Sequence, residues 1–346
     1  MSQNQKICAS IIFNESSIEF SFHTVEDISV QEFTFIDLFA GIGGFHMAAT
    51  QNGGTCIFAS EIDPYAQEAY YENYGIMPFG DITAVGASTI PEHDMLCAGF
   101  PCQPFSIIGN RHGFDDMRGT LFFEIVRILK EKKPSMIVLE NVKQLATHNK
   151  RQTINRILEA LNELGYKTHW TILNALDFGL PQKRERTIIV GFLNHTIQFN
   201  WPQKTSNYTP LEQILETNVD EKYYASQFIY EKRQEAHTSK HFPAIWHENK
   251  SGNVSSHPFS CALRAGASYN YLLVNGERRL TPREMLRLQG FPDSFKIVCS
   301  DSQTRKQAGN AVPVPMIEAV IREVLYAQTQ AERQQKPESA GFVPAW

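Results

Sequence analysis

The sequence lacks the patterns that mark membrane proteins, secreted proteins and zinc sites. No apolar run in it approaches the ~18 residues that a membrane span requires. The first ten residues do not lead from a basic stretch into an apolar one, as a secretory signal does. The six cysteines, at positions 8, 56, 97, 102, 261 and 299, show no C-x-x-C spacing. We therefore expect no metal site, no disulfide framework and no membrane association, and a location in the reducing cytoplasm.

An excess of basic residues is also lacking. The formal net charge is -5, which taken alone speaks against a nucleic-acid partner. The distribution is uneven, because residues 1–60 carry one lysine against six acidic residues, whereas residues 95–190 carry fourteen lysines and arginines against nine acidic residues. The cationic middle of the chain permits a polyanionic substrate without requiring one, and a solvated charged face explains the same counts.

Apolar runs of strand length alternate with amphipathic stretches from residue 33 to residue 192. The alternation predicts a doubly wound α/β sheet with helices on both faces. The strands are expected at 33–38, 56–61, 95–98, 135–139, 166–173 and 187–192, and the helices at 45–51, 64–74, 120–133 and 151–164.

This regularity ends near residue 194, beyond which helical spacing returns only at 281–289 and 315–327. The first 32 residues contain a possible hairpin formed by 7–13 and 18–22. We expect an N-terminal extension at 1–32, a large domain formed by 33–194 with 304–328, a small domain at 195–303, and a disordered polar tail at 329–346.

The segment MLCAGFPCQPFSIIG, residues 95–109, is the most distinctive part of the chain. Its apolar run ends at Gly99, and Pro101 and Pro104 hold Cys102 in a rigid turn. The carboxyl end of a strand is where open α/β sheets bind ligands. Cys102 is therefore a candidate reactive thiol, although an inert buried thiol is the alternative, since free cysteine is usually buried.

A glycine-rich turn, FAGIGG at 39–44, follows a strand and opens a helix. Such glycines let the backbone approach a bound group, and the helix start offers free N–H donors. Glu61, twenty residues beyond Gly41, could accept hydrogen bonds from ribose hydroxyls. Asp81, at the expected end of another strand, could accept from an adenine amino group. Together they predict an adenosine-containing cofactor, without distinguishing NAD from S-adenosylmethionine; glycines that serve only helix–strand packing are the alternative.

Charged residues mark two further strand ends. Glu140 and Asn141 follow an apolar strand, and a carboxylate is costly to bury when ionised, so Glu140 should be paired or have a raised pKa. A structural ion pair is the alternative there. In QKRER, residues 182–186, Arg184 and Arg186 alternate onto one side of a strand. An exposed edge strand would show the same pattern.

Taken in order, these segments resemble the DNA cytosine-C5 methyltransferases. The resemblance covers residues 35–325 except the middle region, and PCQ followed by ENV and then QxRxR is its most specific part. It implies an S-adenosylmethionine-dependent, Rossmann-like fold with a mixed sheet and a target-recognition small domain. The matching segments are DLFAGIGG, SEID, GDIT, GFPCQPFS, RGTLFFEI, VLENV, QKRERTIIVG, RLTPREMLRLQGFPD and QAGNAVPVP.

The resemblance implies a bacterial enzyme that transfers a methyl group from S-adenosyl-L-methionine to C5 of a cytosine flipped out of duplex DNA. Cys102, as thiolate, would add to C6. Glu140 would share a proton with N3, and Asn141 would hold the loop and the base. Arg184 and Arg186 would brace the base carbonyl and the glutamate.

The resemblance also assigns binding residues. The position of Ile62 departs from many relatives, which carry an aromatic there, so adenine stacking would be weaker. The residues implied to bind the cofactor are Phe39, Gly41, Ile42, Gly44, Glu61, Ile62, Asp81, Pro101, Leu121, Asn310 and Ala311. Those expected to contact DNA are Arg111, His112 and Arg118 in a lid loop, for which a plain solvated loop is the alternative, and Arg264, Ser268 and Tyr269, which would read base edges.

Three other functions are weighed against this one. A tRNA cytosine methyltransferase of the same fold is disfavoured by the long variable region, and a nicotinamide-dependent oxidoreductase leaves FPCQ, ENV and QKRER unexplained. A catalytically dead DNA-binding module is disfavoured by the intact Cys102 and Glu140. We expect a monomer that acts on double-stranded DNA as the modification half of a restriction–modification system, with a possible cognate endonuclease and no stable complex with it.

Overall fold

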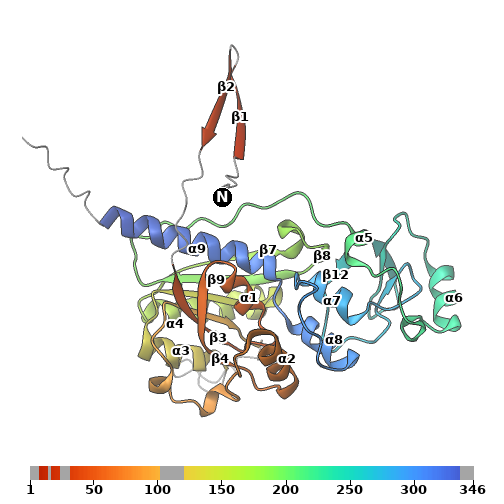
Figure 1. The fold of residues 1–346 in the computed structure, drawn as a ribbon, viewed down its shortest axis with the longest axis horizontal. Helices are drawn as coiled ribbons and strands as arrows, with labels where there is room; N and C mark the ends of the chain where they lie inside the picture. The colour runs from red at the N-terminus through yellow and green to blue at the C-terminus, as the bar shows by residue number, and fades with distance from the viewer. Residues whose placement is uncertain (1–7, 15–16, 24–31, 102–120, 336–346) are drawn as a thin grey trace, which may run out of the picture. The chain divides into compact units, whose positions relative to one another are not determined.

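The computed structural model describes residues 8–14, 17–23, 32–101 and 121–335 of the chain (Figure 1). The chain separates into two units, Met1–Glu32 and Phe33–Trp346. In the first unit, β1 (Cys8–Asn14) pairs antiparallel with β2 (Ser17–His23), which confirms the predicted hairpin. No helix in the described part of the chain is long and apolar enough to cross a membrane.

A six-stranded mixed sheet forms the centre of the second unit, in the order β4-β3-β5-β6-β9-β7. The first four strands of this order are mutually parallel, and β9 runs antiparallel to both of its neighbours. The mixed α/β fold that the sequence predicts is therefore confirmed. The strands are β3 (Phe33–Leu38), β4 (Gly54–Ser60), β5 (Met95–Gly99), β6 (Met136–Val142), β7 (Lys167–Asn174) and β9 (Glu185–Phe192).

Different helices cover the two faces of this sheet, because strand side chains alternate between the faces. Met95 and Cys97 of β5 pack with α1 and α9 in one buried apolar cluster, whereas Leu96 and Ala98 pack with α3 and α4 in another (Figure 1). Cys97 is therefore a core residue. The helices are α1 (Gly44–Thr50), α2 (Pro64–Tyr74), α3 (Leu121–Lys132), α4 (Gln152–Glu163) and α9 (Val314–Gln335).

The boundaries of α2 follow from its sequence. The side chain of Asp63 accepts a hydrogen bond from the N–H of Tyr65, and Pro64 occupies the first helical position, where a missing N–H costs nothing. Gly75 ends the helix with a left-handed φ of 71°. Both ends of this helix lie where the sequence predicts them.

Residues 195–313 form shorter elements, which belong to the same compact unit as the large sheet. A three-stranded antiparallel sheet has the order β11-β10-β13, and β12 pairs with β8 beside it. The division at residue 194 stays a prediction. The elements are β8 (Gln182–Lys183), α5 (Leu211–Ile214), α6 (Gln227–Ala236), β10 (Ile245–Glu248), β11 (Val254–His257), β12 (Ser260–Cys261), β13 (Leu272–Val274), α7 (Pro282–Leu288) and α8 (Asp301–Asn310). Short 3₁₀ helices are η1 (Ile82–Ala84), η2 (Ala87–Thr89), η4 (Lys143–Ala146), η5 (His148–Arg151), η6 (Ala175–Phe178) and η7 (Glu221–Tyr223).

Two expectations are wrong, and one alternative is excluded. Helix α9 continues to Gln335, past the start of the predicted disordered tail, because buried Ala327 and Ala331 extend its apolar stripe. Asp81 does not end a strand; it caps η1, and the preceding chain makes only an isolated bridge between Phe79 and Ser60. β9 is no exposed edge strand, since it lies between β6 and β7.

Candidate active site

A cavity of about 450 Å³ opens at the carboxyl ends of the parallel strands. Every residue predicted to bind the cofactor lines it, and so do Glu140, Asn141, Arg184 and Arg186. The lining also includes Asp63 and Gln307, to which no role was assigned although the quoted segments SEID and QAGNAVPVP contain them, and Lys306, which directly precedes the second of these segments. Cys102, Arg111, His112 and Arg118 lie outside the described residues.

The glycine-rich turn packs tightly at one glycine and is open at another. Gly43 has a φ of 81°, and a Cβ there would lie 2.8 Å from Cζ of the Tyr74 ring, whose hydroxyl donates to the Gly43 carbonyl at 2.8 Å. Gly41 has a φ of 55°, yet nothing lies within 4 Å of the position a Cβ would take. Packing therefore accounts for Gly43, whereas Gly41 leaves backbone open beside the cavity.

Glu61 ties the glycine-rich turn to the end of β4. One carboxylate oxygen accepts from the N–H of Gly41 at 2.7 Å, and the other accepts from the N–H of Asp63 at 2.8 Å. Asp63 in turn accepts from Lys306 Nζ at 2.6 Å. The carboxylate is thus fixed at the cavity by backbone donors and retains lone pairs for a ligand.

Two predicted cofactor residues lie at the exposed rim of the cavity. Ile62 is 68% exposed, so an apolar side chain is free to cover a bound ring. Asp81 accepts from the N–H of Thr83 at 2.9 Å, and this bond is the main cause that lowers the pKa of its carboxyl. Asp81 is therefore an anionic acceptor at neutral pH.

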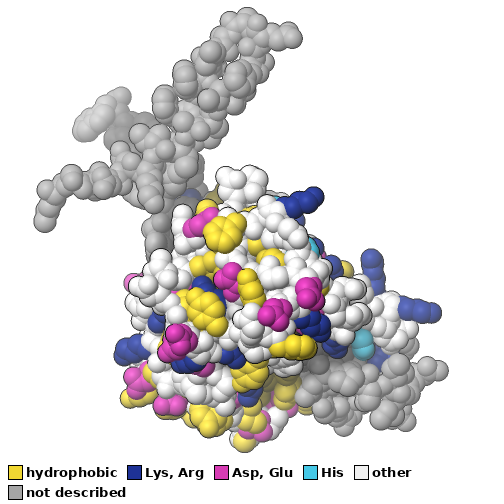
Figure 2. All heavy atoms as spheres, turned by 90° about the vertical axis from the view of Figure 1, so that its right-hand side faces the viewer, with side chains coloured by type: hydrophobic (Ala, Val, Ile, Leu, Met, Phe, Trp, Pro, Cys, Tyr) yellow, Lys and Arg dark blue, Asp and Glu magenta, His cyan; other side chains and the backbone are white. Residues whose placement is uncertain are grey.

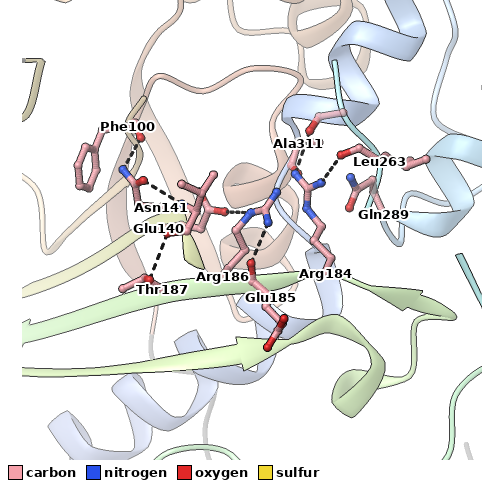
Figure 3. Close-up of polar contacts among 12 residues, drawn as sticks. Phe100, Glu140, Asn141, Arg184, Glu185, Arg186, Thr187, Leu263, Gln289 and Ala311 are labelled. Atoms are coloured by element: carbon pink, nitrogen blue, oxygen red, sulfur yellow. Dashed lines mark hydrogen bonds and ion pairs between the residues drawn. The ribbon is translucent and has the colours of Figure 1, made fainter. Parts of the chain in front are cut away.

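Glu140 is buried against Arg186 (Figure 3). Its Oε1 lies 2.7 Å from Arg186 Nε. Burial raises the pKa of Glu140, and the charges of Arg186 and Arg184 oppose that rise without cancelling it. Glu140 is therefore ion-paired and also has a raised pKa, so both possibilities that the sequence left open hold at once.

Asn141 fixes the backbone at Phe100, two residues before Cys102 in the sequence. Its side-chain amide donates to the carbonyl of Phe100 at 2.8 Å, and its side-chain oxygen accepts from the N–H of Val142 at 2.8 Å (Figure 3). The side chain is 2% exposed, so solvent does not compete for these bonds. Asn141 therefore joins β6 to the end of β5.

Arg184 does not contact the glutamate that both arginines were expected to brace. It is 1% exposed and donates to three backbone carbonyls, those of Leu263 at 2.9 Å, Gly309 at 3.0 Å and Ala311 at 2.7 Å. Burial and the nearby charge of Arg186 lower the pKa of Arg184. Among the described contacts, Arg186 alone pairs with Glu140, and a contact of either arginine with the base carbonyl stays a prediction.

The described residues expected to read DNA, Arg264, Ser268 and Tyr269, lie outside the cavity on an exposed segment. The guanidinium of Arg264 lies 4.7 Å from the centre of the Tyr271 ring. The face drawn in Figure 2 shows basic, acidic and apolar side chains interspersed. The basic residues do not form one continuous patch there, so charge alone does not mark a nucleic-acid surface on this face.

Comparison with known proteins relates the chain to one family. The family model described as C-5 cytosine-specific DNA methylase matches residues 33–326. Type II methyltransferase M.NgoBI of Neisseria gonorrhoeae is 55% identical over 287 residues, which cover 82% of this chain and 90% of that protein. Type II methyltransferase M.HaeII of Haemophilus aegyptius is 52% identical over 307 residues, which cover 88% of this chain and 96% of that protein.

Solved structures show the same fold at lower sequence identity. The crystal structure of the S. pombe Dnmt2 methyltransferase has a TM-score of 0.66 at 21% identity and covers 86% of this chain and 99% of its own. A putative DNA modification methyltransferase encoded within a prophage of E. coli has a TM-score of 0.65 at 19% identity, and covers 86% of this chain and 99% of its own. At these identities the likeness shows the fold alone.

Proposed function

Since the chain belongs to the C-5 cytosine-specific DNA methylase family and is a DNA cytosine-C5 methyltransferase, we propose that its cavity holds S-adenosyl-L-methionine beside a cytosine flipped out of duplex DNA. The observation that carries this proposal is the shared cavity: the glycine-rich turn and Glu61 line one part of it, and Glu140 and Arg186 line another. The family match favours neither the tRNA enzyme nor the nicotinamide-dependent oxidoreductase.

The residues present fit S-adenosyl-L-methionine. The volume of about 450 Å³ lies in the range of roughly 300–1,000 Å³ that small-molecule sites occupy. The open backbone at Gly41 suits close approach of a ligand, the carboxylate of Glu61 suits ribose hydroxyls, and Asp81 suits the adenine amino group. When bound, this cofactor supplies an electrophilic methyl group.

Cys102 is proposed as the nucleophile. Its thiolate would form a bond to C6 of the flipped cytosine, which pushes the ring electrons toward N3 and makes C5 nucleophilic. Loss of the C5 proton after methylation and β-elimination would break the C6–sulfur bond and restore the thiolate. The hydrogen bond from Asn141 to the carbonyl of Phe100 supports this role, because it fixes the backbone two residues before Cys102 in the sequence.

Glu140 is proposed as the acid that shares its proton with N3. The burial that raises its pKa keeps a proton available closer to neutral pH than an exposed glutamate could. Arg186, at 2.7 Å from the carboxylate, orients the group and limits the rise in its pKa. The base would thereby receive a proton as the thiolate attacks C6.

The relatives named as Type II methyltransferases support a more specific role. The chain would be the modification half of a restriction–modification system and protect host DNA in the cytoplasm as a monomer. A cognate endonuclease would recognise the same sequence, without a stable complex between the two proteins.

Transfer of labelled methyl groups tests the proposal. Purified protein is incubated with methyl-labelled S-adenosyl-L-methionine and duplex DNA, and separately with tRNA. Label should enter DNA alone, and bisulfite sequencing of DNA from expressing cells should locate one recurrent sequence. Cys102→Ser should abolish transfer while S-adenosylhomocysteine still binds, and a duplex with 5-fluorocytosine at the target should trap the unchanged chain covalently. Label in tRNA alone, or full turnover by the Cys102→Ser variant, would contradict the proposal.

A further inference from the structure

Two segments that lie far apart in the sequence touch through their backbones beside the cavity. The recognition segment, residues 263–271, carries the exposed side chains expected to read DNA. Residues 309–311, which are the last two residues of α8 and its C-cap and which we call the cofactor loop, line the cavity. A Cβ added at Gly309 would lie 2.8 Å from the Cα of Ala265 and 2.8 Å from the carbonyl carbon of Arg264. Because backbone meets backbone there, neither segment can shift toward the other, and a side chain at Gly309 would push them apart.

Arg184 binds both of these segments through the two terminal nitrogens of its planar guanidinium (Figure 3). We call this set of hydrogen bonds the clamp. Its Nη1 donates to the Leu263 carbonyl of the recognition segment at 2.9 Å. Its Nη2 donates to both ends of the cofactor loop, at the carbonyls of Gly309 and Ala311. A planar guanidinium fixes the relative positions of the groups it binds. A lysine ammonium would keep the positive charge, but it has no planar pair of donors and could not bind the carbonyls of both segments in this geometry.

Two buried glutamines extend the clamp. The side-chain oxygen of Gln182 accepts from the N–H of Leu263 at 2.9 Å, and its amide donates to the carbonyl of Leu288 at 2.8 Å. The amide of Gln289 donates to the carbonyl of Ala308. Both glutamines are 0% exposed. The residues on either side of the contact are therefore held to α7 as well as to each other.

Helix α8 links the recognition segment to the opposite rim of the cavity. Arg305 donates to the carbonyls of Ala267 and Ser268, and its guanidinium lies 4.5 Å from the centre of the Tyr269 ring. The next two residues bind the rim of the cavity: Lys306 pairs with Asp63, and the amide of Gln307 donates to the carbonyl of Tyr65 at 2.9 Å. Consecutive residues of one helix thus bind the recognition segment and the cofactor rim.

We propose that Arg184 and α8 form a coupling element, through which binding of DNA at the recognition segment tightens the cofactor site and binding of the cofactor orients the recognition segment. Arg184 is in this view a positioning residue rather than a catalytic one. The inference rests on the proposed function, because it takes residues 263–271 to contact DNA and the cavity to bind S-adenosyl-L-methionine.

Coupling of this kind is reciprocal and measurable. If DNA raises the affinity for the cofactor by a given factor, the cofactor raises the affinity for DNA by the same factor. The measured quantity is the ratio of the dissociation constants of S-adenosylhomocysteine without and with a saturating duplex that carries the mapped site. For the unchanged chain we expect a ratio of at least about 10, inside the usual range of roughly 5–150 for coupled sites.

Three variants test the element by isothermal titration calorimetry. Arg184→Lys and Gly309→Ala should reduce the ratio to within about twofold of 1, the first by removing the fork and the second by separating the segments. Arg233→Lys is the matched control. Arg233 is also buried and donates to the Asn270 carbonyl of the recognition segment and to Glu248, at 2.9 Å and 2.6 Å. It should weaken DNA binding yet keep the ratio of the unchanged chain, since its described contacts do not include the cofactor loop.

The outcomes separate coupling from mere support of the fold. If these residues only support the fold, Arg184→Lys and Gly309→Ala would weaken the binding of DNA and of S-adenosylhomocysteine but leave the ratio of dissociation constants unchanged. That result would overturn the proposal. The proposal is also overturned if Arg233→Lys reduces the ratio as much as Arg184→Lys does. Should Arg184→Lys fail to fold, Gly309→Ala and Arg305→Lys decide the question. A ratio of 1 in an unchanged chain that methylates DNA refutes the coupling alone, whereas absence of both methylation and S-adenosylhomocysteine binding refutes the proposed function.

Discussion

Two parts of the cavity wall are supported by different forces. The ends of the parallel strands rest on apolar side chains, such as Leu96 and Ile137, which are 0% exposed. The wall formed by Arg184 and the cofactor loop rests on buried polar groups instead, with Gln182 and Gln289 also 0% exposed. Apolar burial is non-directional and tolerates small changes of shape. A buried hydrogen-bonded group tolerates little, because removal of one partner leaves the other unsatisfied.

This difference between the two parts helps to separate residues with a chemical role from residues that position other groups. On the strand-end side, a buried polar side chain such as Glu140 is an exception among apolar neighbours, which favours a chemical role. On the polar side, Arg184 belongs to a network that holds segments together, and Glu284 of α7, which lies behind this wall and does not line the cavity, belongs to another. Substitutions in the two parts should therefore fail in different ways.

The largest effect is expected for Glu140→Gln. The amide cannot donate the proton that N3 requires, and general acid catalysis contributes roughly 10²–10⁴-fold, so single-turnover methyl transfer should slow by about that factor. Binding of S-adenosylhomocysteine should be unchanged. Glu185→Gln is the matched control on the neighbouring strand, because Glu185 pairs with Lys143 at the surface. A Glu140→Gln enzyme within tenfold of the unchanged chain would remove Glu140 from the mechanism.

The next largest effect concerns stability in the polar part. Arg278 donates to both carboxylate oxygens of Glu284, at 2.9 Å and 2.7 Å, and Glu284 is 0% exposed. Arg278→Met leaves that buried carboxylate without its counter-charge and with backbone donors only, the N–H groups of Glu216 and Thr281, which should lower the free energy of unfolding by about 3–5 kcal/mol. Ile137→Val in the apolar part should cost about 0.5–1.5 kcal/mol. Urea unfolding measures both free energies. If Arg278→Met lost no more stability than Ile137→Val, the contrast between the polar and the apolar part would be wrong.

Asn141→Ala should have a smaller effect, split between turnover and stability. Without the amide, the carbonyl of Phe100 loses its partner, which costs about 1–3 kcal/mol. The backbone at Phe100, two residues before Cys102 in the sequence, should also lose this anchor, and a misplaced nucleophile reduces turnover by up to roughly 10²-fold. Single-turnover rates at saturating substrate check this, because the loss should appear in the rate and not in substrate affinity. A pure affinity defect would count against this role.

The two parts also differ in how much of them the sequence predicts. The alternation from 33 to 192 predicts the strands and most helices because each buries an apolar stripe, and burial shows in the local pattern. Helix α8 reads DSQTRKQAGN and has no such stripe. Its buried face consists of Thr304, Gln307 and Ala308, and the partners of that face, such as the Tyr65 carbonyl that Gln307 binds, come from distant parts of the sequence.

The same limit applies to the candidate site. Motifs at strand ends predict that Glu61 and Glu140 line one cavity, because carboxyl ends of parallel strands share one edge. Arg186 reaches the same cavity from the start of the antiparallel strand β9, a position that only the family resemblance indicates. The partners of Arg184 are backbone carbonyls 79, 125 and 127 residues away. Every residue carries a carbonyl, so nothing in the sequence marks those as the ones that Arg184 binds.

The smallest effect is expected where an ion pair joins the two parts of the wall, at Asp63 and Lys306. Asp63→Asn keeps the helix cap, since asparagine caps as well as aspartate, and removes only a partly exposed pair worth about 0.2–1 kcal/mol. Burial raises the pKa of Asp63, but the hydrogen bonds from Lys306 and the N–H of Tyr65 outweigh it and hold the pKa below its usual value. The stabilisation is therefore present above the unfolded pKa of about 3.9 and is lost as pH falls through the lower folded pKa. Urea unfolding at a series of pH values should show that the free energies of unfolding of the unchanged chain and of Asp63→Asn differ at pH 7 and converge in acid. A difference that persists at the lowest pH would mean that the pair does not join the two parts of the wall electrostatically.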